Sequence, residues 1–320
     1  MPFRAPSLRH LGLFFLLAAV TVAGFVAAGL AQGASRHAGA PETVATESVL
    51  VPEPAGRVAP ATWLGYSGRL RAVIDTPESL SQRMLSASLA DSLELADARQ
   101  PGLHDVGLTA PDGDPFYVVS LLPYAEKEGS RLGGYYLGNW PNREGVERYR
   151  PPSGFIEVTP ANEGTAISKQ FHLKDFLTHD QTNVWPKYLV VKPRLLDKLE
   201  LISAALADRG LPSRLHVMSG FRTPQYNEQG VGEKGGRASL SRHMYGDAAD
   251  VFVDQDGNGV MDDLNGDGRV TVADARVLFS VAESVEASNP DLVGGLSPYS
   301  ATSAHGPFVH VDTRGVKARW

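Results

Sequence analysis

The pattern of apolar positions is clearest between residues 190 and 320. Residues 192–210, "KPRLLDKLELISAALADRG", space their leucines and isoleucine at helical intervals, begin with Pro193 near the start and stop at Gly210. This pattern predicts a helix. Three short apolar runs are typical of buried strands: "RLHVMSGF" (214–221), "DAADVFV" (247–253) and "GPFVHVD" (306–312). Strands interspersed with helices predict an α+β domain over 156–320, built on a small antiparallel sheet with flanking helices.

Residues 61–155 give mixed signals. The stretch "SLSQRMLSASLADSLELADA" (79–98) has helical spacing, whereas "PFYVVSLLPY" (115–124) and "GGYYLGNWP" (133–141) favour strands and turns. The aromatic cluster Tyr135, Tyr136 and Trp140 is either a binding face for sugar or peptide or the core of a small β domain. We therefore expect a smaller mixed or β-rich N-terminal domain, to which the pattern assigns no role.

The N-terminus carries an uncharged apolar run, residues 11–30, after Arg4 and Arg9 and before a group of small residues. This arrangement predicts a secretory signal peptide over 1–33. The run is also long enough to cross a bilayer, so an uncleaved membrane anchor is the alternative. Both interpretations predict export to the periplasm or cell envelope. Residues 34–60, rich in Ala, Pro, Glu and small polar residues, predict a flexible linker.

Composition narrows the chemistry. The chain has no cysteine, which excludes disulfides, thiolate zinc sites and cysteine nucleophiles. Any metal ion must therefore be held by His, Asp, Glu, Asn or backbone oxygen. The formal net charge of -6 gives no reason to expect nucleic-acid binding, which usually requires a basic patch.

The segment "SRHMYGDAAD" (241–250) places His243 and Asp250 just before the apolar run "VFV", and "FVHVD" places His310 inside another apolar run. A histidine within a strand is often only a hydrogen-bonded core residue. Two histidines and one carboxylate, however, are a ligand set suited to zinc, with the fourth position left for water. All three lie beside predicted strands, which hold ligands more rigidly than loops do.

These residues resemble motifs of the zinc D-Ala-D-Ala carboxypeptidases. That family includes murein endopeptidases and the D-Ala-D-Ala dipeptidases of vancomycin resistance, and it shares its metal fold with the hedgehog signalling domain. "SRHMYGDAAD" matches its Ser-x-His-x(6)-Asp pattern, "SGFRTPQYN" (219–227) its upstream arginine motif, and "FVHVD" its last ligand. The ending "HVDTRGVKARW" is similar to that of the YcbK-like periplasmic branch. The resemblance covers about residues 165–320.

The resemblance implies an exported zinc metallopeptidase that hydrolyses peptide bonds in peptidoglycan stem peptides or cross-links, as a carboxypeptidase or an endopeptidase. Arg222 would face the substrate carboxylate or the developing oxyanion. Ser241 would steady the loop of His243, and Asp312 would accept the ring N–H of a ligand. The implied zinc ligands are His243, Asp250 and His310.

The sequence departs from the family at the general base. Relatives often carry an acidic residue three positions before the last histidine, or a second histidine two before it; this chain has Pro307 and Phe308 there. His305 is the nearest titratable substitute, and Asp247 is another candidate. Without a base, the domain would be a catalytically inactive cell-wall-binding module that retains its metal.

An acidic segment, residues 254–274, separates the two halves of the predicted zinc site. Its second part has calcium-loop spacing and resembles a dockerin-type half EF-hand, with Gly268 at the sharp turn. The predicted ligands are Asp263, Asn265, Asp267, Arg269 (through its backbone carbonyl), Thr271 and Asp274; a less regular second site would use Asp254, Asp256, Asn258 and Asp262. We expect calcium to be structural here. The alternatives are a polar loop without an ion and a calcium-dependent surface that docks a partner protein.

Overall fold

The structure is a computed structural model that describes residues 62–63, 102–109, 115–141, 143, 145–232 and 236–320. The predicted signal peptide or anchor (1–33), the linker (34–60) and the helical pattern at 79–98 lie outside these residues. Within the described part of the chain, no helix combines the length and the apolar character needed to cross a membrane.

The described part has an α+β fold centred on a five-stranded sheet, in the order β13-β11-β12-β10-β9. Its strands are β9 (Leu215–Ser219), β10 (Ala248–Val253), β11 (Gly295–Tyr299), β12 (Phe308–Asp312) and β13 (Ala318–Arg319). Neighbouring strands are antiparallel except β11 and β13, which are parallel. The sequence therefore predicted the class, and three of its strand runs correspond to β9, β10 and β12.

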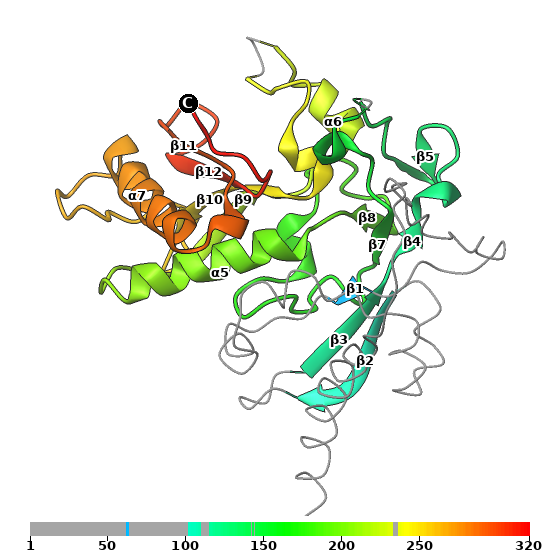
Figure 1. Cartoon of the computed structure of the whole chain (residues 1–320), viewed down its shortest axis with the longest axis horizontal. Helices are drawn as coiled ribbons and strands as arrows, with labels where there is room; N and C mark the ends of the chain where they lie inside the picture. The colour runs from blue at the N-terminus through cyan, green and yellow to red at the C-terminus, as the bar shows by residue number, and fades with distance from the viewer. Residues whose placement is uncertain (1–61, 64–101, 110–114, 142, 144, 233–235) are drawn as a thin grey trace, which may run out of the picture. The chain divides into compact units, whose positions relative to one another are not determined.

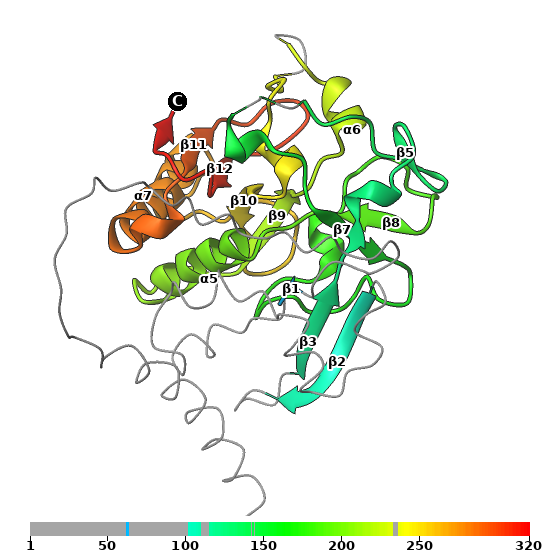
Figure 2. The ribbon, with the colours of Figure 1, turned by 45° about the vertical axis from the view of Figure 1, so that its right-hand side comes forward.

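Two long helices accompany this sheet. They are α5 (Pro193–Ala207), where the periodic pattern predicted it, and α7 (Val272–Ser288), which follows the acidic segment. Figure 1 and Figure 2 both show the two helices next to each other along the sheet, and α7 contacts β11 and β12. Pro193 stands in the first turn of α5, where its missing N–H has no helical partner to lose.

The remaining strands form three small sheets, with the orders β4-β7-β8, β1-β3-β2 and β5-β6. Their bounds are β1 (Thr62–Trp63), β2 (Gly102–Thr109), β3 (Pro115–Ser120), β4 (Leu122–Pro123), β5 (Arg131–Leu132), β6 (Tyr135–Tyr136), β7 (Gly154–Val158) and β8 (Lys187–Leu189). The short helices are η2 (Tyr124–Glu126), η3 (Glu147–Tyr149), η4 (Leu173–Phe176), α6 (Pro224–Glu228), η5 (Arg242–Tyr245) and η6 (Pro290–Leu292).

The aromatic cluster at 135–140 belongs to the hydrophobic core. Tyr135 and Trp140 are buried, whereas Tyr136 is partly exposed. The indole N–H of Trp140 donates to the carbonyl of Met244, 2.7 Å away, directly behind His243. Described residues on both sides of the boundary expected between 155 and 156 share one hydrophobic cluster. A core role therefore holds for Tyr135 and Trp140, in a core shared with later residues, and it does not hold for Tyr136.

Candidate metal centre

The alternation of side chains along β12 sets the position of the site. Val309 and Val311 are fully buried, and the residues between and beside them point to the opposite face of the sheet. His310 lies on that opposite face. Asp250 of β10 is paired directly with His310, so the two side chains emerge next to each other. Ser219 at the end of β9 pairs with Asp250 from the other side.

His243 reaches the same place from η5, just before β10. The chain turns between them at Gly246, which has a left-handed φ of 69°. A Cβ atom at this position would lie 2.5 Å from the carbonyl oxygen of Val190, so both the φ and the packing require glycine. The turn sends the chain from η5 into β10 and brings His243 back over Asp250.

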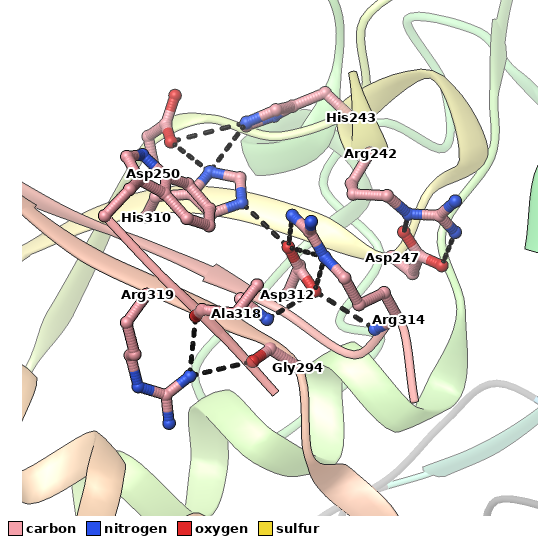
Figure 3. Close-up of polar contacts among 12 residues, drawn as sticks. Arg242, His243, Asp247, Asp250, Gly294, His310, Asp312, Arg314, Ala318 and Arg319 are labelled. Atoms are coloured by element: carbon pink, nitrogen blue, oxygen red, sulfur yellow. Dashed lines mark hydrogen bonds and ion pairs between the residues drawn. The ribbon is translucent and has the colours of Figure 1, made fainter. Parts of the chain in front are cut away.

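Three side-chain atoms converge at this point, as Figure 3 shows. His243 Nε2 lies 3.3 Å from both His310 Nδ1 and Asp250 Oδ1, and His310 Nδ1 lies 2.9 Å from Asp250 Oδ1. A tetrahedral zinc ion with nitrogen and oxygen ligands at about 2.0–2.1 Å holds those atoms about 3.3 Å apart. His243, Asp250 and His310 are 3%, 8% and 7% exposed. They form a buried group that could hold a metal ion.

Hydrogen bonds on the outer side of each ring fix which nitrogen points inward. His243 Nδ1 lies 2.7 Å from the carbonyl oxygen of Gly220, and His310 Nε2 lies 3.0 Å from Asp312 Oδ2. Because the Gly220 carbonyl is an acceptor, Nδ1 of His243 carries the proton and its Nε2 presents a lone pair. His310 has a carboxylate beside each ring nitrogen, so with the proton on Nε2 towards Asp312 its Nδ1 presents a lone pair towards Asp250. In that state two nitrogen lone pairs and a carboxylate oxygen meet at one point, and such a set could hold a divalent metal ion.

The charges around the group are compatible with a bound cation. Burial, and then the positive charge of Arg222, lower the pKa of His243, which keeps this ring neutral as a ligand must be. Burial alone would lower the pKa of His310, but its hydrogen bonds to Asp250 and Asp312 raise it. Although burial opposes this, the two histidines hold the pKa of Asp250 well below its usual range. A proton on His310 or a bound metal ion would each offset the negative charge of Asp250.

Asp312 occupies the place predicted for it, behind His310. Its Oδ2 accepts from His310 and from Arg314 Nε, which is 2.8 Å away. Its Oδ1 accepts the backbone N–H groups of Gly295 at 2.7 Å and Arg314 at 3.0 Å. Hydrogen bonds with these partners, above all His310 and Arg314, hold the pKa of Asp312 far below its usual value despite burial. The carboxylate is thus fixed, and it fixes the ring orientation of His310.

The structure places Arg222 beside the group, in contact with Asp250, one of its three candidate metal-binding residues. Its Nη2 lies 3.3 Å from Asp250 Oδ2 and 3.1 Å from Ser219 Oγ. The side chain is mostly buried. The described contacts of Arg222 are with Asp250, Ser219 and Asn227, and its expected role towards a substrate stays a prediction.

The two candidate bases lie in different surroundings. Asp247 is buried and pairs with Arg242 and Lys192, and Figure 3 shows the Arg242 pair apart from the three converging atoms. Both of its oxygens are engaged, so this geometry sets Asp247 aside as a base. His305 lies on the loop between β11 and β12, with its ring 4.9 Å from that of Phe308. Phe308 shares the face of β12 that carries His310, so the described contact of His305 places it on the same face.

Two further residues stand next to the group. Ser241 is buried at the start of η5, where its carbonyl accepts from Met244 N at 3.3 Å. Trp320 lies over His310, with ring centroids 5.3 Å apart, and is 55% exposed. The indole N–H of Trp320 donates to the hydroxyl of Tyr299, and its carbonyl accepts from Ser297. The spacing of residues in the sequence gives no signal for this contact of Trp320 with His310.

The acidic segment forms turns stabilised by its own side chains. Asp263 accepts from the backbone N–H groups of Gly266 and Gly268, at 2.8 and 2.7 Å. Asp274 accepts from the N–H groups of Leu264 at 2.9 Å and Thr271 at 2.8 Å, the latter as part of a capping box at the start of α7. Within the described residues, no acidic group of this segment converges as the His–Asp–His group does. The calcium ligands therefore stay a prediction.

Comparison with family models, with curated proteins and with solved structures gives no match.

Proposed function

We propose that this chain is an exported zinc metallopeptidase that hydrolyses peptide bonds in peptidoglycan stem peptides or their cross-links. The observation that carries the proposal is the convergence of His243 Nε2, His310 Nδ1 and Asp250 Oδ1 in a buried group with fixed ring orientations. The motif resemblance supplies the substrate class. Export, expected from the apolar N-terminus, suits this substrate because peptidoglycan lies outside the inner membrane.

Zinc bound by these three residues would supply a Lewis acid that polarises a peptide carbonyl and activates water. His243 and His310 would hold it through one nitrogen each, because their outer nitrogens contact Gly220 and Asp312. The group contributes only three ligand atoms, which leaves a position for water or substrate.

His305 is the proposed proton carrier. Its ring contacts Phe308, whose Cα lies about 7 Å from that of His310 along the strand. The side chain is partly exposed, so it can approach a reacting water directly or through one other water. Replacing His305 with glutamine should leave metal binding intact and lower kcat.

The test is digestion of purified peptidoglycan by the zinc-loaded full chain, with mass spectrometry of the released muropeptides. Wild type should remove a residue or open a cross-link, and the mass change identifies the bond. His243→Ala should lose zinc and all release, because two ligand atoms cannot hold the ion in this position. His179→Ala is the matched control: this histidine is exposed, and the variant should match wild type.

A catalytically inactive cell-wall-binding module is the alternative function. Pro307 and Phe308, which stand where relatives often carry an acidic residue or a second histidine, favour it. In that case the zinc-loaded wild type would sediment with peptidoglycan and release nothing over long incubation. That result would overturn the peptidase proposal while leaving the metal site in place.

A structural calcium ion in the segment 263–274 is the second cofactor of the proposal. Its support is the spacing of oxygen-bearing residues, together with the tight turns in which Asp263 and Asp274 are held. The segment lies between β10, which carries Asp250, and α7, which packs on the strand of His310. Calcium there would stabilise the frame of the zinc site.

A further inference from the structure

We propose that Arg222 is a positioning residue, which holds Asp250 in a one-oxygen binding mode, and that it does not bind substrate. The segment Ser219–Arg222 would then be the frame that orients two of the three metal-binding side chains. This inference rests on the metal site of the proposed function and is independent of whether the chain cleaves peptides.

The two carboxylate oxygens of Asp250 have separate partners. Oδ1 faces His243 and His310, whereas Oδ2 lies 3.3 Å from Arg222 Nη2. Binding of a metal ion through both oxygens would require Oδ2 to leave the arginine. Because the arginine is itself mostly buried, that movement would leave a guanidinium without its charge partner in a dry environment. Arg222 therefore keeps Asp250 a one-oxygen ligand and preserves an open position on the ion.

Three of the five N–H donors of Arg222 have partners inside the protein. The two hydrogens of Nη2 have partners in Asp250 Oδ2 and Ser219 Oγ, and Nη1 lies 3.5 Å from Asn227 Oδ1. A guanidinium that grips a substrate carboxylate normally offers paired N–H groups in a fork. Here Nη2, one arm of that fork, already contacts Asp250 Oδ2 and Ser219 Oγ.

The backbone of the same segment orients His243. The carbonyl oxygen of Gly220 accepts from His243 Nδ1, and the N–H of Arg222 donates to the carbonyl of His243, 3.2 Å away. Gly220 is required by close packing, because a Cβ atom there would lie 2.6 Å from Phe176 Cα. One short segment thus sets the ring orientation of His243 and the carboxylate orientation of Asp250.

The pairing also sets the charge of the site. Asp250 is matched by Arg222, and Asp312 is matched by Arg314. With both histidines neutral, the protein groups around the ion balance one another. The positive charge of a bound divalent ion would then remain available to polarise water and substrate, as a Lewis-acid site requires.

The experiment compares wild type with Arg222→Gln and Arg222→Lys, using the full chain stripped of metal. Zinc affinity is measured by competition with a chromophoric chelator, and coordination by the visible absorption of Co²⁺ added in place of zinc. We expect Arg222→Gln to lower zinc affinity 10- to 100-fold, the usual effect of losing a group that orients a ligand. Its Co²⁺ bands should shift as Asp250 begins to bind through both oxygens.

Arg222→Lys should show a smaller loss of affinity, because its ammonium keeps a positive charge that can pair with Asp250 Oδ2. Arg209→Gln is the matched control, since this exposed arginine contacts Ala205 and Ser284 of the two long helices. Its zinc affinity and Co²⁺ spectrum should equal those of wild type.

Unchanged zinc affinity and an unchanged Co²⁺ spectrum in Arg222→Gln, with a raised KM for anionic peptides, would overturn the inference in favour of substrate binding. If Arg222→Gln does not fold, Arg222→Lys decides by the same two measurements. If the variants behave as expected while wild type cleaves no muropeptide, the positioning role stands and the peptidase proposal fails.

Discussion

The two histidines of the candidate metal-binding group turn different ring nitrogens towards its centre, Nε2 in His243 and Nδ1 in His310. The difference follows from their places in the fold. His243 comes from a short helix, so its far nitrogen reaches the site while the near one meets Gly220. His310 lies in a strand directly beside Asp250, so its near nitrogen faces the site and the far one meets Asp312.

Trp320 offers a direct reporter of ion binding, because its indole lies over the ring of His310. Co²⁺ bound by His310 should quench the emission of this tryptophan, since open-shell ions quench nearby indoles strongly. Trp320→Phe should remove most of the quenching, whereas Trp185→Phe, a partly exposed tryptophan that contacts Lys187, should retain it. An excess of zinc should restore the emission. Equal quenching in wild type and Trp320→Phe would show that Co²⁺ binds elsewhere.

For individual residues, the sequence predicted which side chains could bind a metal ion better than it predicted which residues the side chains contact. His243, Asp250 and His310 could be selected because they stand beside or within predicted apolar strands and match the motifs that carry the family resemblance. The partners of Arg222 and Asp247 could not be selected. Each depends on a contact between segments, Arg222 with Asp250 and Asp247 with Lys192, which hydrophobic periodicity does not encode.

Among the elements, the connection from β10 to α7 has the most unusual composition. Its last residues form a capping box, in which Thr271 accepts from Ala273 N and Asp274 accepts from Thr271 N. Asp274 therefore starts α7 as well as standing at a predicted calcium position. The Thr-x-x-Asp spacing is a known helix-start signal. The same two residues were predicted only as calcium ligands, although their spacing also predicts the start of α7.

Calcium bound by this connection should stabilise the folded chain. We expect the melting temperature of the zinc-loaded chain to rise as calcium is added, because an ion that binds only the folded state stabilises it. Asp263→Ala should abolish the rise, since Asp263 occupies the first loop position. Asp291→Ala, an acidic residue of η6 outside the segment, is the control and should keep it. An unchanged melting temperature, with zinc retained, would remove calcium from the proposal.

Elements with strong periodicity were predicted, and those without it were not. The helix α5 and the strands β10 and β12 follow from apolar patterns that match their burial. The strand β11 has the sequence "GLSPY", which contains a proline and no alternation, and it pairs with β12 through tertiary contacts alone. The burial of Tyr135 and Trp140 in a core shared with later residues likewise depends on contacts distant in sequence.

For the molecule as a whole, a buried charge cluster joins the helices to the sheet behind the metal site. Lys198 of α5 is fully buried, and its ammonium donates to Glu286 of α7 and to the carbonyl of Asp312, 2.7 Å away. Glu286 also accepts from Gly294 N at 2.9 Å and from Arg319 of β13. Lys198 stands on the apolar face of α5, three residues after Leu195. A lysine within the apolar stripe of a helix indicates a buried group of opposite charge, which here is Glu286.

Lys198→Met should lower the free energy of unfolding by about 3 kcal/mol, because it leaves the buried Glu286 with one charge partner fewer. Lys192→Met is the matched control. Its ammonium is half exposed and pairs with Asp247, which keeps Arg242, so its removal should cost no more than about 1 kcal/mol. Denaturant unfolding of both variants, with metal absent and then present, provides the measurement.

Lys198 also holds the backbone of Asp312, which in turn orients His310. Lys198→Met should therefore weaken zinc binding as well, whereas Lys192→Met should not. Equal losses of stability and of zinc affinity in the two variants would show that the buried cluster does not support the metal site.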